Sequence, residues 1–342
     1  MTSLSDARLF PVDMDVPGRR VSLLELHPDV LEQSAFMDTR MTAPLERARP
    51  TPIQDVLAAD IPHAGIGWIF HTSFCCSTLL ARALHSPPHQ VVLKEPLVLR
   101  RLADARHGEI AVAGLLDPVL RLLGRPWHPG GSVVIKPSHA ALNIAADLLA
   151  ARPDSRALVM TSSLEDFLVS NMKKSPATQR KIPALVERAF SACSLHSRLP
   201  PLAFDPPDAL AGAALQWAAQ RETCLDLLEA RGPGTVRVLD AADFLADLPA
   251  VTWRCAQWLR LSVPKKTLEL RVAEVGTRNA KEVGVAYGSE HRAAETEILK
   301  TRYREHIDGA IRWFDRFVAP GMRAQALALS DTSTGTAALL RQ

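Results

Sequence analysis

The chain has 342 residues, a formal net charge of +3 and 47% hydrophobic residues. This hydrophobic content is enough to bury a sizeable core, and so small a net charge is not the basic footprint of a nucleic-acid-binding protein. No apolar run approaches the ~20 residues that cross a bilayer, so we expect no membrane partner. The amino terminus lacks the features of a secretion signal, and the five cysteines form no metal-ligand pattern. We therefore expect a protein of a reducing compartment, the cytoplasm.

Residues 1–60 read as an appended N-terminal segment. An apolar stretch predicts a strand at Val21–Leu26, a helix is expected over 29–41, and 43–52 reads as a connector. The next 260 residues, 61–320, are expected to form the main domain, with a helical insertion near 175–230. The last segment, 321–342, is predicted to be a C-terminal tail whose end frays.

The stretch from Trp68 to Leu84 is the most informative part of the chain. A short apolar run leads into small and hydroxyl residues and then into a strong helix-forming segment. This order predicts a strand, a phosphate-binding loop and a helix, because the first N–H groups of a helix are unpaired and attract anions. The expected loop residues are Thr72, Ser73, Phe74, Cys75, Cys76, Ser77 and Thr78. The loop lacks the glycines and lysine of a Walker A motif, so it indicates a phosphate-bearing donor without indicating ATP.

Five short apolar runs predict the strands of one sheet. They lie near 66–70, 91–94, 132–136, 156–160 and 235–239. Helical segments alternate with the first four, and this alternation predicts a three-layer α/β fold with a central parallel sheet of about five strands flanked by helices. Ligands of such sheets bind at the carboxyl ends of the strands. The charged residues at these ends are His71, Lys94, Glu95 and Lys136.

Later segments are predicted from periodicity and from turn residues. We expect an excursion of helices over 175–207 and an amphipathic helix over 208–230. Further helices are expected over 249–261 and 290–317, and the Gly-punctuated stretch 278–288 is expected to be a loop.

The order and spacing of these motifs resemble the sulfotransferases that use 3'-phosphoadenosine-5'-phosphosulfate (PAPS). Ser73–Leu80 stands where that family has a loop such as Pro-Arg-Ser-Gly-Thr-Thr-Leu-Leu, which binds the 5'-phosphosulfate. Lys136–His139 is similar to the family's Lys-Thr-Pro segment. Pro153–Arg156, a strand and Ser162–Ser170 follow in the order of Pro-Asp-Ala-Lys, a strand and Arg-Asp-Pro-x-Asp-x-x-x-Ser, which holds the 3'-phosphate.

The resemblance covers about Ile66 to Lys174 and continues weakly to about Leu259. It implies a P-loop NTPase-like fold, PAPS as co-substrate without a metal, and transfer of a sulfuryl group to a hydroxyl or amine of a small-molecule acceptor. An atypical nucleotide-dependent kinase and a non-catalytic nucleotide- or anion-binding relict of the fold are the alternatives. The kinase would need a P-loop lysine and a magnesium-holding acid.

Three positions depart from the family pattern. Phe74 replaces a basic residue of the loop, Cys76 replaces a glycine, and Ser162 replaces the arginine of the 3'-phosphate site, whereas Ser170 is kept. Lys173 and Lys174 lie three and four residues beyond Ser170, on the same helix face. We therefore predict that Ser170, Lys173 and Lys174 hold the 3'-phosphate; the alternative is that both lysines are solvated and the donor lacks a 3'-phosphate.

The resemblance also implies roles for the charged strand ends. His71 or Glu95 would take the proton of the acceptor, and Lys94 or Lys136 would neutralise charge on the bridging oxygen. Simpler interpretations stay open: His71 bonds to loop backbone, and Glu95 forms a salt bridge with Lys94 or Arg100. Cys75 and Cys76 are either small residues that let a phosphate approach or, less simply, reactive thiols at a helix start.

Overall fold

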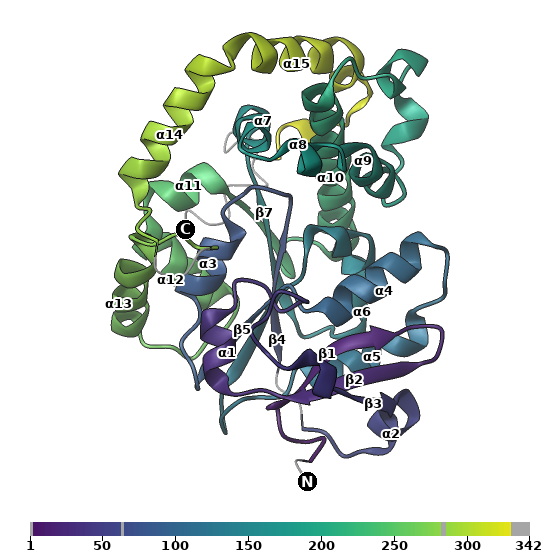
Figure 1. Ribbon diagram of the computed structural model, residues 1–342, viewed down its shortest axis with the longest axis vertical. Coiled ribbons are helices and arrows are strands. Elements are labelled where there is room, and N and C mark those ends of the chain that lie inside the picture. The colour runs from purple at the N-terminus through teal and green to yellow at the C-terminus, as the bar shows by residue number, and fades with distance from the viewer. Residues whose placement is uncertain (1–2, 63–64, 282–284, 330–342) are drawn as a thin grey trace. The chain divides into compact units, whose positions relative to one another are not determined.

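The computed structural model describes residues 3–62, 65–281 and 285–329. The chain divides into two units, and Figure 1 labels the elements from which they are built. Unit 1 comprises Met1–Phe70, Ser77–Ala157 and Asp247–Ala286, and unit 2 comprises His71–Cys76, Leu158–Ala246 and Tyr287–Gln342. Within the described ranges, no helix has both the length and the apolar character that a membrane crossing requires.

A five-stranded sheet of order β5-β6-β4-β7-β8 confirms the predicted α/β fold. Its strands are β4 (Ile66–His71), β5 (Gln90–Lys94), β6 (Ser132–Lys136), β7 (Arg156–Thr161) and β8 (Val236–Asp240). Every predicted strand is present and ends within one residue of its expected bounds. The sheet is parallel in the registers of β4 with β6 and of β5 with β6. The strands are rich in Val, Ile and Leu and almost entirely buried, as strands covered by helices on both faces must be.

Helices of unit 1 follow its strands in the expected alternation. They are α3 (Ser77–Ala83), α4 (Leu97–His107), α5 (Ala113–Leu123), η2 (His139–Ile144), α6 (Ala145–Ala151), α12 (Leu248–Trp258) and α13 (Lys265–Gly276). The helix predicted over 249–261 is α12, whereas α13 was not predicted. The indole of Trp258 donates to the carbonyl of Ala157 at 2.9 Å, which joins α12 to the strand β7 that begins beside it.

The first 60 residues form a three-stranded antiparallel sheet of order β1-β2-β3 with two short helices. Its elements are β1 (Leu9–Asp15), β2 (Arg20–Glu25), α1 (Pro28–Gln33), η1 (Leu45–Arg47), β3 (Arg49–Pro52) and α2 (Ile53–Ala58). The predicted helix over 29–41 is therefore wrong after Gln33, and the end of the expected connector is a strand. β1 escaped prediction because Pro11 and a bulge between Pro11 and Asp13 interrupt its alternation.

This N-terminal segment is bonded into unit 1. β1 packs against α4 and α5, and the buried guanidinium of Arg125 donates to the carbonyls of Leu4, Asp6 and Leu9. The amide of Met37 donates to the carbonyl of Lys94 at 2.6 Å, at the end of β5. Residues of the first 60 therefore reach the carboxyl edge of the sheet.

Unit 2 is built around the long helix α10. Its helices are α7 (Leu164–Met172), α8 (Pro176–Gln179), α9 (Ile182–Phe190), η3 (Leu195–Arg198), η4 (Pro201–Phe204), α10 (Ala209–Arg231), α11 (Ala241–Ala246), α14 (Ser289–Arg302), α15 (Arg304–Phe317), η5 (Ala319–Gly321) and α16 (Ala324–Leu327). The predicted helical excursion and the helix starting near 208 are both present.

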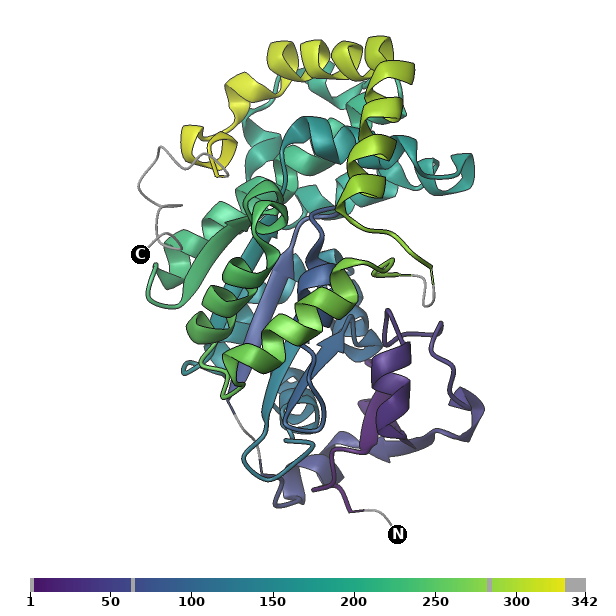
Figure 2. The ribbon, with the colours of Figure 1, turned by 90° about the vertical axis from the view of Figure 1, so that its left-hand side faces the viewer.

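Two helical predictions need correction. α10 is not amphipathic, because α7, α9, α15 and α16 all pack on it and leave it no water-facing side until its last turns. The sequence pattern did not reveal this burial, because the many alanines of α10 are compatible with both a buried and an exposed helix face. The helix expected over 290–317 is two helices, which bend at Tyr303 (Figure 2). The expected loop at 278–288 contains no helix or named strand in its described part, and 282–284 lie outside the described residues.

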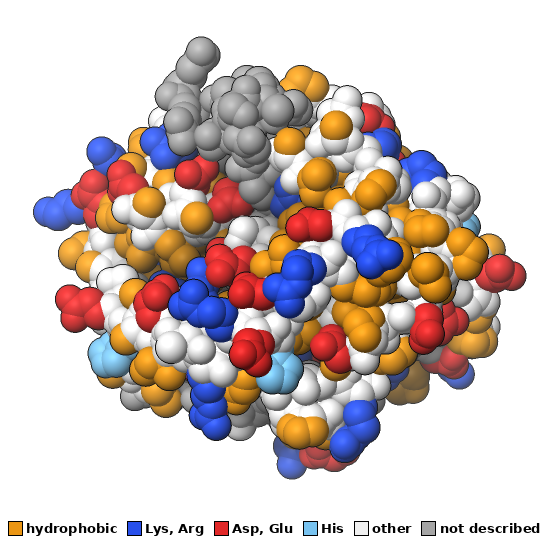
Figure 3. Space-filling view, turned by 90° about the horizontal axis from the view of Figure 1, so that it is seen from above, with side chains coloured by type: hydrophobic (Ala, Val, Ile, Leu, Met, Phe, Trp, Pro, Cys, Tyr) orange, Lys and Arg blue, Asp and Glu red, His pale blue; other side chains and the backbone are white. Residues whose placement is uncertain are grey.

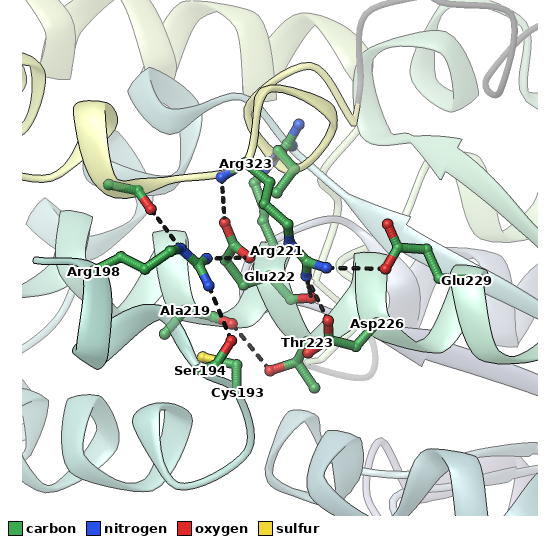
Figure 4. Close-up of polar contacts among 12 residues, drawn as sticks. Cys193, Ser194, Arg198, Ala219, Arg221, Glu222, Thr223, Asp226, Glu229 and Arg323 are labelled. Carbon is green, nitrogen blue, oxygen red and sulfur yellow. Dashed lines mark hydrogen bonds and ion pairs between the residues drawn. The ribbon is translucent and has the colours of Figure 1, made fainter.

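An ion-pair network around the buried Glu222 holds the C-terminal segment on α10 (Figure 4). Glu222 is 1% exposed, and its carboxylate accepts from the backbone and Nε of Arg323, both at 2.7 Å. Arg198 pairs with the same carboxylate at 2.7 Å. Arg323 also reaches Asp226 at 2.5 Å and Glu229 at 2.9 Å. The start of the predicted tail is thus docked, and its remainder, 330–342, lies outside the described residues.

On the face drawn in Figure 3, acidic and basic side chains are interspersed with apolar ones. This distribution agrees with the small net charge of +3. The charges on this face therefore do not form a broad electrostatic field of one sign.

Candidate functional site

The predicted phosphate-binding loop connects β4 to α3. Phe74 and Cys76 have φ angles of 61° and 60°, while Cys75 between them stays at negative φ. Turns in which a left-handed residue neighbours a residue of negative φ direct successive N–H groups toward one side and form anion-binding concavities. Left-handed backbone costs a non-glycine residue about 1–3 kcal/mol, so the surroundings must hold the loop in this shape.

Contacts within unit 2 hold the loop. The amide of Thr72 donates to the carbonyl of Met160 at 2.9 Å, and the thiol of Cys75 donates to the carbonyl of Thr72 at 3.1 Å. The amide of Ser73 donates to Oε1 of Gln220 on α10 at 3.2 Å. This last N–H is therefore bound by a glutamine and not directed at a ligand. The buried, backbone-bonded Cys75 fits the structural interpretation of the cysteine pair.

His71 ends β4 with its ring buried at 5% exposure. Its Nδ1 lies 2.8 Å from the carbonyl oxygen of Thr72, which accepts a hydrogen bond from it. A neutral imidazole carries one proton, so this bond assigns the proton to Nδ1 and makes Nε2 the basic nitrogen. The bond to loop backbone is thus present, and it orients the ring in the way that a general base requires.

Lys94 and Lys136 end neighbouring strands and are partners in the parallel register of β5 and β6. Both side chains are buried, so both ammonium groups need partners inside the protein. Lys136 donates to the carboxylate of Glu95 at 2.5 Å. The Glu95 amide donates to the Lys136 carbonyl at 2.6 Å, with Glu95 in the left-handed region at φ 55°. Of the two interpretations left open for Glu95, a salt bridge is present, but its partner is Lys136 and neither Lys94 nor Arg100.

Lys94 has a different environment from that of its neighbour. Its ammonium donates to the backbone carbonyl of Leu31 in α1. Burial lowers the pKa of Lys94 to about 7, and the nearby charge of Arg82 lowers it further, whereas Glu32 acts in the opposite direction. Lys94 therefore gives up its proton more readily than an exposed lysine does.

Ser162 follows β7 and is buried, and its hydroxyl has no hydrogen-bond partner among the residues that the structure describes. Arg221 of α10 places a guanidinium beside it, where Nη1 donates to Oγ1 of Thr161 at 3.0 Å. The indole of Trp217 donates to the Ser162 carbonyl at 3.0 Å. Sequence reasoning missed Arg221, which is 59 residues from Ser162 and belongs to no motif. The guanidinium of Arg221 thus places a positive charge beside Ser162, which itself carries none.

The three residues expected to hold a 3'-phosphate do not all converge. Lys173 is ion-paired with Glu295 of α14 at 2.8 Å, and Tyr287 donates to the same carboxylate oxygen. The Lys174 ammonium lies 5.1 Å from the ring centroid of Phe74 in the loop. Ser170 is partly buried on α7. The binding of a 3'-phosphate by these three residues stays a prediction. The two lysines have different partners, Glu295 for Lys173 and the Phe74 ring for Lys174.

Comparison with known proteins gives similarity to sulfotransferase structures. No family model and no curated protein matches the chain. The crystal structure of a sulfotransferase from Alicyclobacillus acidocaldarius is 17% identical with a TM-score of 0.39, covering 72% of this chain and 97% of that one. The sulfotransferase domain from the curacin biosynthetic pathway is 11% identical with a TM-score of 0.41, covering 70% and 97%. At TM-scores below 0.5, the donor and the acceptor have to be inferred from this chain's own residues.

Proposed function

We propose that the chain is a sulfotransferase-like enzyme that transfers a sulfuryl group from PAPS to a hydroxyl or amine of a small-molecule acceptor. The observation that carries the proposal is the loop between β4 and α3, which holds Phe74 and Cys76 at positive φ without a single glycine. A chain accepts this strain where the N–H groups serve a purpose, and oxyanions are the ligands that such N–H groups bind.

The donor would be held by the loop through its 5'-phosphosulfate. The side chains of Thr72, Ser73, Ser77 and Thr78 are buried at the loop and at the start of α3. Hydroxyl groups there add hydrogen bonds to a phosphate without adding charge. Ser162, whose buried hydroxyl lacks a partner within the described ranges, and Arg221 beside it are candidates for a second phosphate.

In the proposed reaction the acceptor oxygen or nitrogen attacks sulfur and forms the new bond. The bond from sulfur to the bridging oxygen breaks, adenosine 3',5'-bisphosphate leaves, and the acceptor proton goes to a base. Nε2 of His71 is the favoured base, because the carboxylate of Glu95 is already bound to Lys136. Lys136 would then stabilise the charge that develops on the bridging oxygen, with Glu95 orienting it, and Lys94 would add positive charge when protonated.

Binding and transfer assays together test this function. The full chain is titrated calorimetrically with adenosine 3',5'-bisphosphate and with ATP–Mg, and incubation with PAPS and a panel of alcohols, phenols and amines is followed by mass spectrometry. We expect tight bisphosphate binding and acceptor products heavier by one sulfuryl group. A preference for ATP–Mg would instead indicate a kinase, and binding of neither nucleotide would indicate the relict. In either case the proposal is wrong.

The double variant Ser77→Ala/Thr78→Ala localises the donor site. It should weaken bisphosphate binding about tenfold or more, since two hydrogen bonds to a charged group are lost. The far-ultraviolet circular dichroism and the unfolding midpoint should stay close to those of the wild type. Unchanged affinity in the folded double variant would place the donor elsewhere.

A further inference from the structure

Phe74 presents its ring between an aromatic partner and a cation. Its ring packs edge-on against Phe167 of α7, with centroids 5.3 Å apart. The ammonium of Lys174 lies over the same ring, 5.1 Å from its centroid. All three residues belong to unit 2, and α7 supplies both Phe167 and, just after its last turn, Lys174. The loop residue thus holds a lysine that is distant from it in the sequence.

The contact positions the Lys174 ammonium without using its hydrogen-bonding capacity. An ammonium has three N–H donors, and an aromatic face attracts the charge through its quadrupole instead of accepting conventional hydrogen bonds. Among the residues that the structure describes, the ammonium group of Lys174 has no hydrogen-bond acceptor and no ion-pair partner, and its backbone amide donates to the carbonyl of Asn171. The neighbouring Lys173 is bound to Glu295, which Tyr287 also contacts. Glu295 is therefore bound to Lys173 and lies near Lys174 without pairing with it, so one positive charge is left over beside the loop.

We infer that Lys174 is the cation of the loop and binds the oxyanion held there, with the Phe74 ring as its support. The identity of the nucleotide rests on the proposed function. If the donor is PAPS, Lys174 would contact its 5'-phosphosulfate and not its 3'-phosphate. This assignment differs from the sequence-based prediction, which grouped Lys174 with Ser170 and Lys173. It also gives a role to an aromatic residue at a left-handed position, where its backbone is strained.

Calorimetric titration of the full chain with three anions tests the inference. Inorganic pyrophosphate probes the loop alone, adenosine 5'-monophosphate adds the nucleoside, and adenosine 3',5'-bisphosphate adds the second phosphate. Lys174→Met should weaken all three by a similar factor of about ten or more, because a charged hydrogen bond is lost in each. The control Lys300→Met removes an ammonium that is paired with Glu165 in the same unit and should change each affinity less than about twofold.

Variants at Phe74 separate a support from a bystander. Phe74→Tyr keeps the ring face and should bind as the wild type does, whereas Phe74→Leu should lose part of the affinity. Phe74→Arg combined with Lys174→Met places a cation directly in the loop and should recover most of the lost binding. The fold of each variant is checked by circular dichroism. If the Phe74 variants unfold, Lys174→Met, a change at a partly exposed position, still tests whether Lys174 binds the anion.

Four outcomes overturn the inference. They are an unaltered affinity in Lys174→Met, a loss equal to that of Lys300→Met, a loss confined to the bisphosphate, and pyrophosphate binding to none of the proteins. Failure of the proposed function has a different signature. If pyrophosphate binds in a Lys174-dependent way and no nucleotide does, the loop cation stands and PAPS is not the donor. If Lys174→Met transfers the sulfuryl group as the wild type does, the proposed function is supported and the inference about Lys174 is wrong.

Discussion

Lys94 and Lys136 are opposite each other in the register of β5 and β6, yet Lys136 donates to the carboxylate of Glu95, while Lys94 donates to the backbone carbonyl of Leu31. Two buried ammonium groups on adjacent strands would repel each other if both were charged. The two lysines therefore differ in their partners: Lys136 forms an ion pair with Glu95, and the pKa of Lys94 is lowered by burial.

The pH dependence of stability should reveal Lys94. Its pKa in the folded chain is about 7, against 10.5 in an exposed lysine. Between these values the unfolded chain binds the proton that the folded chain has released, so the contribution of Lys94 to the free energy of unfolding rises from about pH 7 to about pH 10.5. The free energy of unfolding is measured by urea denaturation at each pH for the wild type and for Lys94→Met. The difference, wild type minus variant, should rise from about pH 7 to about pH 10.5.

The matching control is Lys300→Met, which should give a difference curve that is flat from pH 7 to pH 9.5. The pKa of Lys300 is raised by its hydrogen bond to Glu165, so it stays protonated in this range. A flat curve for Lys94→Met as well would mean that Lys94 is charged in the folded protein at neutral pH.

The Lys136–Glu95 pair should behave as one unit. Lys136→Met removes a fully buried partner and should cost about 3 kcal/mol of unfolding free energy, because Glu95 is then left without its cation. Glu95→Gln keeps an acceptor and should cost less. The double variant should be less damaged than the sum of the single changes, which a double-mutant cycle by chemical denaturation measures. Additive losses would show that the two groups do not interact energetically.

The loop backbone makes a prediction about Cys76. Glycine adopts its φ of 60° without steric cost, so Cys76→Gly should be neutral or stabilise the fold by up to about 1 kcal/mol. Cys76→Val should destabilise by about 1–3 kcal/mol, since a β-branched residue is poorly accommodated there. Ser73→Gly is the matched control at negative φ and should lose about 0.5–1 kcal/mol. The reverse order of the two glycine variants, measured by thermal unfolding, would contradict the observed loop.

Glu222 should be the critical acid of the C-terminal docking site. Glu222→Gln removes a buried charge from two arginines and should lower the unfolding free energy by about 3 kcal/mol. Glu229→Gln removes a half-exposed partner of the same Arg323 and should cost less than about 1 kcal/mol. Hydrogen exchange of residues 319–329 should also accelerate in the first variant alone. Equal effects of both variants would mean that burial is not what gives Glu222 its importance.

The strands of the sheet could be predicted because each is a short apolar run between turn residues, a local signal. Partners in space carry no such signal. The choice of Lys136 by Glu95 depends on the register of two strands, and the approach of Arg221 to Ser162 depends on how α10 packs. Sequence spacing likewise grouped Lys174 with Lys173, whereas packing directs it to Phe74.

The bond from Lys94 to the carbonyl of Leu31 gives the first 60 residues a part in the electrostatics of the sheet edge. A version of the protein trimmed to begin near β4 would keep every motif that suggests a sulfotransferase and still admit water to this amine. Its proton affinity would then return toward that of an ordinary lysine. Swapping N-terminal segments between related proteins is thus a way to retune acid–base behaviour at the sheet edge while leaving every residue of the loop and the strands unchanged.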